Sequence, residues 1–226
     1  MNHESKIQQA INTLLQFDSM CSSREFLLSS FSKEDMIILH LMTENDLFRD
    51  VYTIDTGMLN QETYSFIHKI KNEYGVSIKF LFPDFKDIEN MLSTYGPNLF
   101  YESVQKRELC CSLRKVNPLN RLLLERNYWI TGIRSEQTEV RKKSALIEIN
   151  DSYKKCNPLL NWDSVDVDKF VKSENIPINS LYSKGYRSIG CAPCSMPSSG
   201  NRDGRWWWED GVRECGIHRI GDHNDS

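Results

Sequence analysis

The chain has 226 residues, 39% of them hydrophobic, and a formal net charge of −3. This length suits one α/β domain with a buried core better than two small domains. The small net charge excludes a global positive field for nucleic acid, so an anionic ligand must meet a local basic cluster. The polar N-terminus lacks a signal-peptide core, and no apolar run approaches the roughly 20 residues of a membrane span. We therefore expect a soluble, cytoplasmic protein.

The N-terminal segment, residues 1–20, is predicted to form an amphipathic helix. Ile7, Ile11, Leu14 and Leu15 recur there at helical spacing. Packing of this apolar stripe on the domain is favoured over contact with a partner subunit.

The next residues have the layout of a phosphate-binding turn. The apolar run at residues 26–28 predicts a strand, Ser30 and Ser32 lie in a serine-rich turn, and Glu34 and Asp35 would begin a helix. Backbone N–H groups at a helix N-terminus and serine hydroxyls favour an anion. Serine caps also begin many ordinary helices, so the pattern alone favours a structural cap.

Strands alternate with helices in the residues that follow. The segment of residues 49–59 is predicted to contain a strand that ends in Asp55-Thr56-Gly57. A helix over residues 60–75, which ends at Gly75, and a further strand over residues 76–82 follow. This alternation predicts a parallel sheet, in which ligands bind beyond the carboxyl ends of the strands. Asp55 fits a ligand contact and a turn-forming residue equally well.

The second half of the chain begins with an irregular pattern over residues 85–108. Another strand is predicted at residues 128–130, followed by a basic loop that contains Arg134 and Arg141, and a short helix is predicted from Ser164. Arginine side chains bind sulfate and phosphate through paired hydrogen bonds. The alternative for this loop is a charged segment exposed to solvent.

Four of the seven cysteines form two pairs, Cys110-Cys111 and Cys191-x-x-Cys194. An odd number of cysteines with a vicinal pair fits metal or redox chemistry in a reducing compartment better than a disulfide framework. The two pairs would complete a four-thiolate set if the fold brings them together. Cys215 would then remain free to react.

The segments CCSLRKVNPL, WITGIRSEQTEVR, GYRSIGCAPC, GRWWW and ECGIH occur in this order. With them the chain resembles the assimilatory adenylyl-sulfate/phosphoadenylyl-sulfate reductase family from about residue 26 to residue 218. The resemblance implies an adenine-nucleotide α-hydrolase-like α/β fold, with a parallel sheet flanked by helices and related to the PP-loop ATP pyrophosphatases. We expect one domain over residues 1–226, with a mobile C-terminal tail over residues 200–226 that carries the catalytic cysteine.

The two cysteine pairs resemble the iron–sulfur branch of this family, which binds a [4Fe-4S] cluster and uses adenosine 5'-phosphosulfate. The resemblance implies that the cluster ligands are Cys110, Cys111, Cys191 and Cys194, and four thiolates suit such a cluster. Zinc bound by the same four sulfurs is the alternative.

The resemblance also implies a mechanism in which the Cys215 thiolate attacks the sulfur of the phosphosulfate and expels AMP. Thioredoxin would then release sulfite from the resulting S-sulfonate. Because the sequence ends eleven residues after Cys215, we expect the reductant to be a separate protein. The implied substrate contacts are Ser30, Ser32, Lys115, Gly132, Arg134, Arg141, Arg202, Arg205 and His218. Lys115, four residues after Cys111, is expected to couple cluster and substrate.

Several alternatives stay open at this point. The substrate can instead be 3'-phosphoadenosine 5'-phosphosulfate, or both nucleotides; more remote are an ATP-dependent sulfur transferase or pyrophosphatase and a redox sensor that binds iron–sulfur or zinc. A homo-oligomer is compatible with the sequence. Residues 206–208, three tryptophans, are favoured as apolar anchors over adenine stacking. Lys33 and Met58 depart from the family pattern at the nucleotide site.

Overall fold

The computed structural model describes residues 1–21, 25–47, 50–200, 202–210, 214 and 216–219. Within these residues one sheet has the strand order β3-β2-β1-β4-β6-β5. All neighbouring strands are parallel except β5 and β6. The strands are β1 (Phe26–Leu28), β2 (Asp50–Ile54), β3 (Ile78–Leu81), β4 (Tyr128–Ile130), β5 (Ile147–Ile149) and β6 (Lys154–Cys156).

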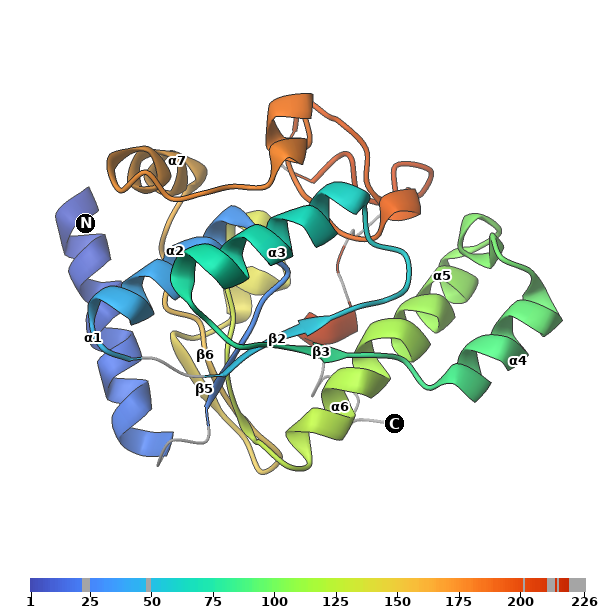
Figure 1. Cartoon of the computed structure of the whole chain (residues 1–226), viewed down its shortest axis with the longest axis horizontal. Helices are drawn as coiled ribbons and strands as arrows, with labels where there is room; N and C mark the ends of the chain where they lie inside the picture. The colour runs from blue at the N-terminus through green and yellow to red at the C-terminus, as the bar shows by residue number, and fades with distance from the viewer. Residues whose placement is uncertain (22–24, 48–49, 201, 211–213, 215, 220–226) are drawn as a thin grey trace.

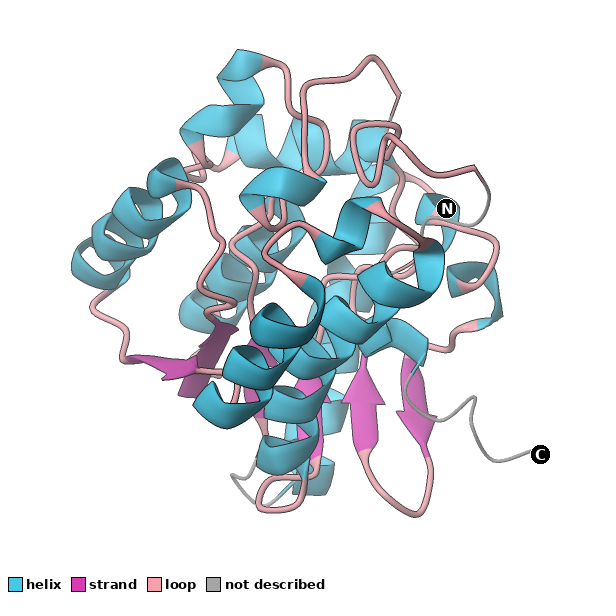
Figure 2. Cartoon of the chain, turned by 90° about the vertical axis from the view of Figure 1, so that its right-hand side faces the viewer, coloured by secondary structure: helices cyan, strands magenta, loops and turns pink. Residues whose placement is uncertain are grey.

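Helices cover both faces of this sheet (Figures 1 and 2). One face shares a core with α1 (His3–Cys21), α2 (Lys33–Glu44), α3 (Gln61–Tyr74) and α7 (Ser164–Ser173). The other face packs against α6 (Asn117–Leu123). Two further helices, α4 (Phe85–Tyr95) and α5 (Val104–Cys111), lie on the side of the molecule away from α1 and α7 (Figure 1).

Neighbouring strand residues divide between the two cores. In β1, Phe26 packs in the α6 core and Leu27 in the opposite core; in β4, Trp129 and Ile130 do the same. Side chains alternate along a strand, so a sheet covered on both faces requires consecutive apolar residues. This explains why the central strands β1 and β4 are short apolar runs in the sequence.

Most predicted elements are confirmed. The N-terminal helix, the strands β1 to β4 and the helix from Ser164 all form, and the predicted parallel sheet is present. Helix α3 ends at Gly75 with φ +63°, a left-handed conformation that glycine adopts without a Cβ clash. The α1 residues Ala10, Leu14 and Phe17 are buried in the main core, as expected for a packing role.

Two predictions about the middle of the chain were wrong or incomplete. Residues 85–108 are not irregular, because they contain α4 and most of α5. Helix α4 fully buries only Met91, although Ile88, Leu92 and Tyr95 recur with it at helical spacing. The Asp84 side chain caps this helix by accepting from the Lys86 and Asp87 N–H groups. The β5–β6 hairpin was not predicted, since Lys154 and Lys155 give β6 a polar sequence.

The strand order places a topological switch point between β1 and β4. From β1 the chain moves outward to β2 and β3, and it then returns to β4 on the other side of β1. Crevices form at such points beyond the carboxyl ends of the strands. No helix in the described part of the chain is both long and apolar enough to cross a membrane.

Candidate active site

A cavity of about 200 Å³ opens at this switch point, between the segments that follow β1 and β4. Eight of the nine predicted substrate contacts line it: Ser30, Ser32, Lys115, Gly132, Arg134, Arg141, Arg202 and Arg205. The side chain of the ninth, His218, lies outside the described residues, as does Cys215. Segments separated by more than 170 residues therefore meet around one cavity.

The serine turn after β1 is held by a carboxylate of the protein itself. Oδ2 of Asp35 accepts from the Ser30 N–H at 2.7 Å, the Ser30 hydroxyl at 2.8 Å and the Ser32 N–H at 3.4 Å. Phe31 adopts a left-handed φ of +58°, which turns both N–H groups toward this oxygen. Burial raises the pKa of Asp35 to about 6, although the Ser30 hydrogen bonds oppose this shift. A carboxylate thus occupies the donors that a phosphate-binding turn offers.

Gly132 lets the loop after β4 approach this turn. A Cβ at this position would lie 2.6 Å from Asp35 Oδ1 and 2.8 Å from Glu34 Cβ. A larger residue would push β4 away from α2 and widen the cavity. The contact is a packing requirement that holds whatever the cavity binds.

Arg134 is buried beside the serine turn, with 5% of its surface exposed. Its Nε donates to Glu34 Oε1 at 2.8 Å, and it also pairs with Glu136. Arg141, also 5% exposed, pairs with Glu214 at 2.8 Å. The two arginines of the basic loop are therefore buried, whereas Lys142 and Lys143 in the same loop are exposed.

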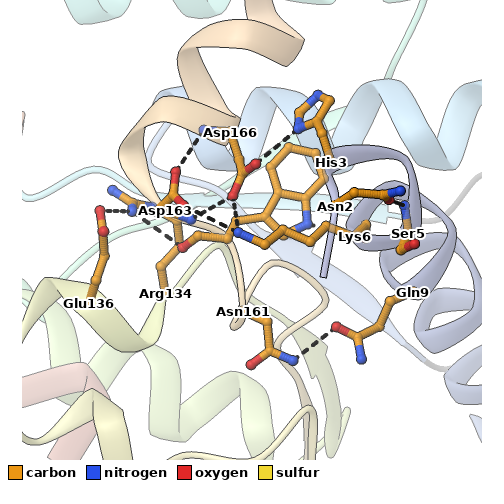
Figure 3. A network of polar contacts seen from close by, with 11 residues as sticks. Asn2, His3, Ser5, Lys6, Gln9, Arg134, Glu136, Asn161, Asp163 and Asp166 are labelled. Carbon is orange, nitrogen blue, oxygen red and sulfur yellow. Dashed lines mark hydrogen bonds and ion pairs between the residues drawn. The ribbon is translucent and has the colours of Figure 1, made fainter.

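The Arg134 region borders a polar network that joins α1 to the start of α7 (Figure 3). Lys6 pairs with Asp163 at 3.2 Å and with Asp166, and His3 Nδ1 lies 3.0 Å from Asp166 Oδ1. Burial favours a raised pKa for Asp166, but the Lys6 ammonium holds that pKa below its usual range. These contacts fix α1 against the domain, in agreement with its predicted packing role.

A second, smaller cavity contains all four paired cysteines. Its lining includes Cys110, Cys111, Cys191 and Cys194, each buried with 7–8% exposed surface. The first pair ends α5, and a π-helical turn, residues 112–116, follows it directly. The predicted meeting of the two pairs is confirmed.

Cationic side chains surround these thiols. Burial would raise the pKa of Cys191, but Lys115, the Thr56 hydroxyl and Arg205 lower it below its ordinary value. Burial raises the pKa of Cys194 to about 12. The Thr56 hydroxyl lies 3.2 Å from the Cys191 sulfur.

Two residues that line the cysteine cavity carry a buried donor without a hydrogen-bond partner among the described residues: Arg114 Nε and Trp206 Nε1. The other end of the Arg114 guanidinium donates to the Thr56 carbonyl at 2.6 Å. Buried N–H groups without a partner are rare and costly. Within the described residues, no group of three or more His, Cys, Asp and Glu side chains is arranged to hold a single metal ion.

The two cavities share a wall formed by Lys115 and Arg205. Arg205 Nε donates to the Cys194 carbonyl at 3.0 Å, and its guanidinium lies 4.7 Å from the Trp206 ring centre. Trp206 is fully buried and does not line the larger cavity. The prediction that it anchors the tail, instead of stacking on a base, agrees with this position.

The structure also accounts for the residues that depart from the family pattern. Lys33 points out of the serine turn, because its ammonium pairs with Asp168 at 2.6 Å. Met58 packs in the hydrophobic cluster around the cysteines. Asp55 forms a turn by accepting from the Gly57 N–H at 2.8 Å, and it does not line the larger cavity.

Other lining residues were not predicted from the sequence. Thr131 and Gln137 lie in the WITGIRSEQTEVR segment, and Arg187 lies in GYRSIGCAPC, so motif position was the available signal. Tyr182 lies in an unremarkable segment, and only the fold reveals that its hydroxyl accepts from the Lys33 N–H at 3.2 Å.

The phosphoadenosine phosphosulfate reductase domain family matches residues 24–197. The chain belongs to the adenylyl-sulfate/phosphoadenylyl-sulfate reductase family. It is 41% identical to an adenosine 5'-phosphosulfate reductase from Sinorhizobium fredii, over 86% of this chain and 80% of the relative. It is 38% identical to one from Agrobacterium fabrum, over 92% of this chain and 82% of the relative.

Solved structures show the same fold for this family member. A phosphoadenylyl-sulfate reductase from Candida auris superimposes with a TM-score of 0.67 at 24% identity, over 81% of this chain and 88% of that one. An NAD synthetase from Campylobacter jejuni gives a TM-score of 0.56 at 10% identity, over 81% and 77% of the two chains. The fold predicted from the resemblance is confirmed.

Proposed function

We propose that this protein reduces adenosine 5'-phosphosulfate to sulfite and AMP, through an S-sulfonate on Cys215 and with thioredoxin as reductant, in assimilatory sulfate reduction. The relatives named above as adenosine 5'-phosphosulfate reductases support this substrate. The observation that carries the proposal is the shared wall. A cavity lined by eight implied substrate contacts adjoins a cavity with four buried thiols, and Lys115 and Arg205 belong to both.

The proposed first step is a nucleophilic displacement at sulfur. The Cys215 thiolate forms a sulfur–sulfur bond to the sulfonyl group, and the bond between that sulfur and the bridging oxygen breaks. The electron pair leaves on the AMP phosphate, and the enzyme retains a cysteine S-sulfonate. No electron from outside is consumed in this step.

The second step requires two electrons from an external dithiol. One thiolate of thioredoxin attacks the Cys215 sulfur and releases sulfite, forming a mixed disulfide between the two proteins. The second thioredoxin thiol then resolves this disulfide and regenerates the Cys215 thiolate. Thioredoxin leaves with an internal disulfide, so atoms and electrons balance.

The larger cavity, called the nucleotide cavity from here on, supplies the donors that the nucleotide needs. The Ser30 and Ser32 groups offer N–H and hydroxyl donors at the N-terminus of α2, where the helix dipole also favours an anion. To bind there, a phosphate must share or displace the Asp35 carboxylate. Arg202, Arg205 and Lys115 supply positive charge for the sulfate and for the AMP leaving group.

The cysteine cavity fits a [4Fe-4S] cluster by its donor set. Four buried thiols meet there, cations surround them, and the unpartnered N–H groups of Arg114 and Trp206 face the same space. Cluster sulfurs accept hydrogen bonds, so they would satisfy both groups. Cys110, Cys111, Cys191 and Cys194 would hold the cluster, which supplies a negatively charged, polarisable centre when bound.

Lys115 is the residue that we propose to couple the two cavities. Its ammonium acts on the Cys191 sulfur by charge and hydrogen bonding, and the same side chain lines the nucleotide cavity. It would orient the sulfate while it compensates thiolate charge.

The decisive experiment is incubation with adenosine 5'-phosphosulfate without thioredoxin, followed by intact mass measurement. We expect a mass gain of one SO₃ group, lost on addition of thioredoxin with release of sulfite, and absent in Cys215→Ser. The same assay with 3'-phosphoadenosine 5'-phosphosulfate compares the two nucleotides. A Cys215→Ser protein with full sulfite production would overturn the mechanism.

A further inference from the structure

Glu214, the residue joined to Cys215, is among the most buried carboxylates of the described chain, with 1% of its surface exposed. Its Oε2 accepts from the Thr138 hydroxyl at 2.6 Å and from Arg141 Nε at 2.9 Å. Its Oε1 accepts from Arg141 Nη2 at 2.8 Å. Arg202 Nη2 lies 3.9 Å from the same oxygen.

These contacts commit Arg141 to the tail. Two edges of its guanidinium donate hydrogen bonds. Nε and Nη2 donate to the Glu214 carboxylate, and Nη1 donates to the side-chain amide oxygen of Gln137. A buried bidentate pair of this kind has fixed geometry, and removal of one partner leaves an unpaired buried charge. Arg141, an implied substrate contact, lines the larger cavity while its Nε and Nη2 groups hold the residue that precedes Cys215.

The residues on the other side of Cys215 also pack against the domain. A Cβ at Gly216 would lie 3.1 Å from Val116 Cγ2, and Ile217 packs beside the α6 core and lines the nucleotide cavity. Val116 ends the π-helical turn that contains Lys115. Both sequence neighbours of Cys215 therefore contact the domain.

We propose that Glu214 is a positioning residue for the Cys215 nucleophile, acting through its buried pair with Arg141 and its hydrogen bond to Thr138. The pair joins the residue before Cys215 to Arg141, which lines the nucleotide cavity. This inference rests on the proposed role of Cys215 as nucleophile. A nucleophile held in reacting geometry gains rate through orientation, without any change in substrate affinity.

A general loss of packing in the C-terminal segment would also slow the reaction of Cys215. A matched control variant is therefore needed, and the chain offers one. Glu209 forms a second buried arginine pair in the same segment, with its Oε1 3.0 Å from Arg107 Nε. Glu209 is 8% exposed and lies six positions from Cys215, whereas Glu214 adjoins it. The variants Glu214→Gln and Glu209→Gln therefore remove the same interaction at different distances from the nucleophile.

The first measurement needs no nucleotide. The full-length protein is treated with iodoacetamide, and the rate of carbamidomethylation at Cys215 is followed by peptide mass spectrometry. We expect Glu214→Gln to change this rate about tenfold, and Glu209→Gln less than about twofold. Equal changes in the two variants would show general loosening of the tail and would overturn the proposal.

The second measurement separates positioning from binding. In single-turnover reactions we expect Glu214→Gln to slow S-sulfonate formation about 30-fold at saturating adenosine 5'-phosphosulfate, with the half-saturating concentration changed less than about twofold. Thr138→Val, which removes the hydroxyl that donates to Glu214, should slow S-sulfonate formation about threefold. A rise in the half-saturating concentration at an unchanged maximal rate would instead make Glu214 part of the substrate site.

The two proposals fail in different ways. If the unchanged protein forms no S-sulfonate, the proposed function fails and the alkylation data alone describe Glu214. If the unchanged protein forms it and both Glu214→Gln and Thr138→Val match its rate and its alkylation, only the positioning role is overturned. Thr138→Val keeps the ion pair, so it tests the idea even if Glu214→Gln does not fold.

Discussion

The two adjoining cavities differ in how their charged and polar groups are satisfied. In the nucleotide cavity, carboxylates of the protein pair with the donors of the serine turn and the basic loop: Asp35 holds the serine turn, and Glu34 pairs with Arg134. Trp129 Nε1 is a buried donor of this cavity without a partner among the described residues. In the cysteine cavity, the buried N–H groups of Arg114 and Trp206 have no partner.

This difference indicates two kinds of binding. At the serine turn and Arg134 the donors of the nucleotide cavity are already paired, so an anion bound there must exchange with a carboxylate or share its donors. The cysteine cavity lacks acceptors for its buried donors, so an occupant that supplies them would complete its packing. We therefore expect the first cavity to tolerate loss of its ligand and the second to depend on its occupant.

The largest effect is expected from a change in the cysteine set. Cys194→Ser should lower bound iron from about four per chain to less than about one, because a cluster held by three thiolates is labile. Iron analysis and the visible absorption spectrum measure this loss. Cys156→Ala is the matched control, since Cys156 is a buried free thiol in the sheet core. Full iron content in Cys194→Ser would break the proposed ligand set.

A substitution in the wall that the two cavities share should give the next largest effect. Lys115→Ala is expected to slow S-sulfonate formation about 100-fold, because a cation that contacts both cavities is lost. Mass spectrometry of the intact protein measures the rate, and Lys106→Ala, an exterior lysine paired with Glu102, is the control. Unchanged turnover together with an unchanged cluster spectrum would show that Lys115 does not couple the cysteine cavity to the nucleotide cavity.

The pH dependence of the unfolding free energy tests the buried state of Asp35 in the nucleotide cavity. Its pKa is raised to about 6, so the folded state binds this proton more tightly than the unfolded chain does. The resulting stability is fully present below pH 4 and is lost as the pH rises through about 6. Relative to Asp35→Asn, the unfolding free energy of the unchanged protein should therefore fall by up to about 3 kcal/mol between pH 4 and pH 7.

Denaturant unfolding at several pH values measures this difference. Asp168→Asn serves as control, because Asp168 also contacts the serine-turn region through Lys33 but is largely exposed. A constant difference between the unchanged protein and Asp35→Asn from pH 4 to pH 7 would contradict the assigned burial effect.

The smallest expected effect concerns an unpartnered donor. Trp206→Phe keeps the aromatic ring but removes the N–H, and we expect iron loss in air to be about threefold faster. Trp208→Phe is the control, because the Trp208 N–H already donates to the Phe100 carbonyl at 3.1 Å. If the two variants lose iron at the same rate, the Trp206 N–H does not contact the occupant.

Sequence prediction succeeded where the signal was local. The strand and turn at residues 26–32, the glycine end of α3 and the two cysteine pairs were all recognised from neighbouring residues. Sequence prediction missed α4, although Ile88, Met91 and Leu92 recur there at helical spacing, and it missed β6, whose buried Lys155 pairs with Glu148. Only in β6 is the stabilising contact invisible as an apolar pattern.

The assignment of individual site residues shows the same limit. Eight of the nine residues that motif resemblance implied as substrate contacts line the larger cavity. The motif did not indicate that one of them, Arg141, also pairs with Glu214, 73 residues away. A motif records which residue type stands at a position, whereas its hydrogen-bond partners depend on the path of the whole chain.

The sequence by itself indicated the family, the α/β class, the two cysteine pairs and eight of the residues that surround the nucleotide cavity, because each depends on local patterns or motif order. Only the tertiary structure decided which donors are already paired, that Lys115 and Arg205 form a wall common to both cavities, and that Glu214 is buried next to Cys215 in the sequence. These facts arise from contacts between distant segments, which the switch point between β1 and β4 brings together.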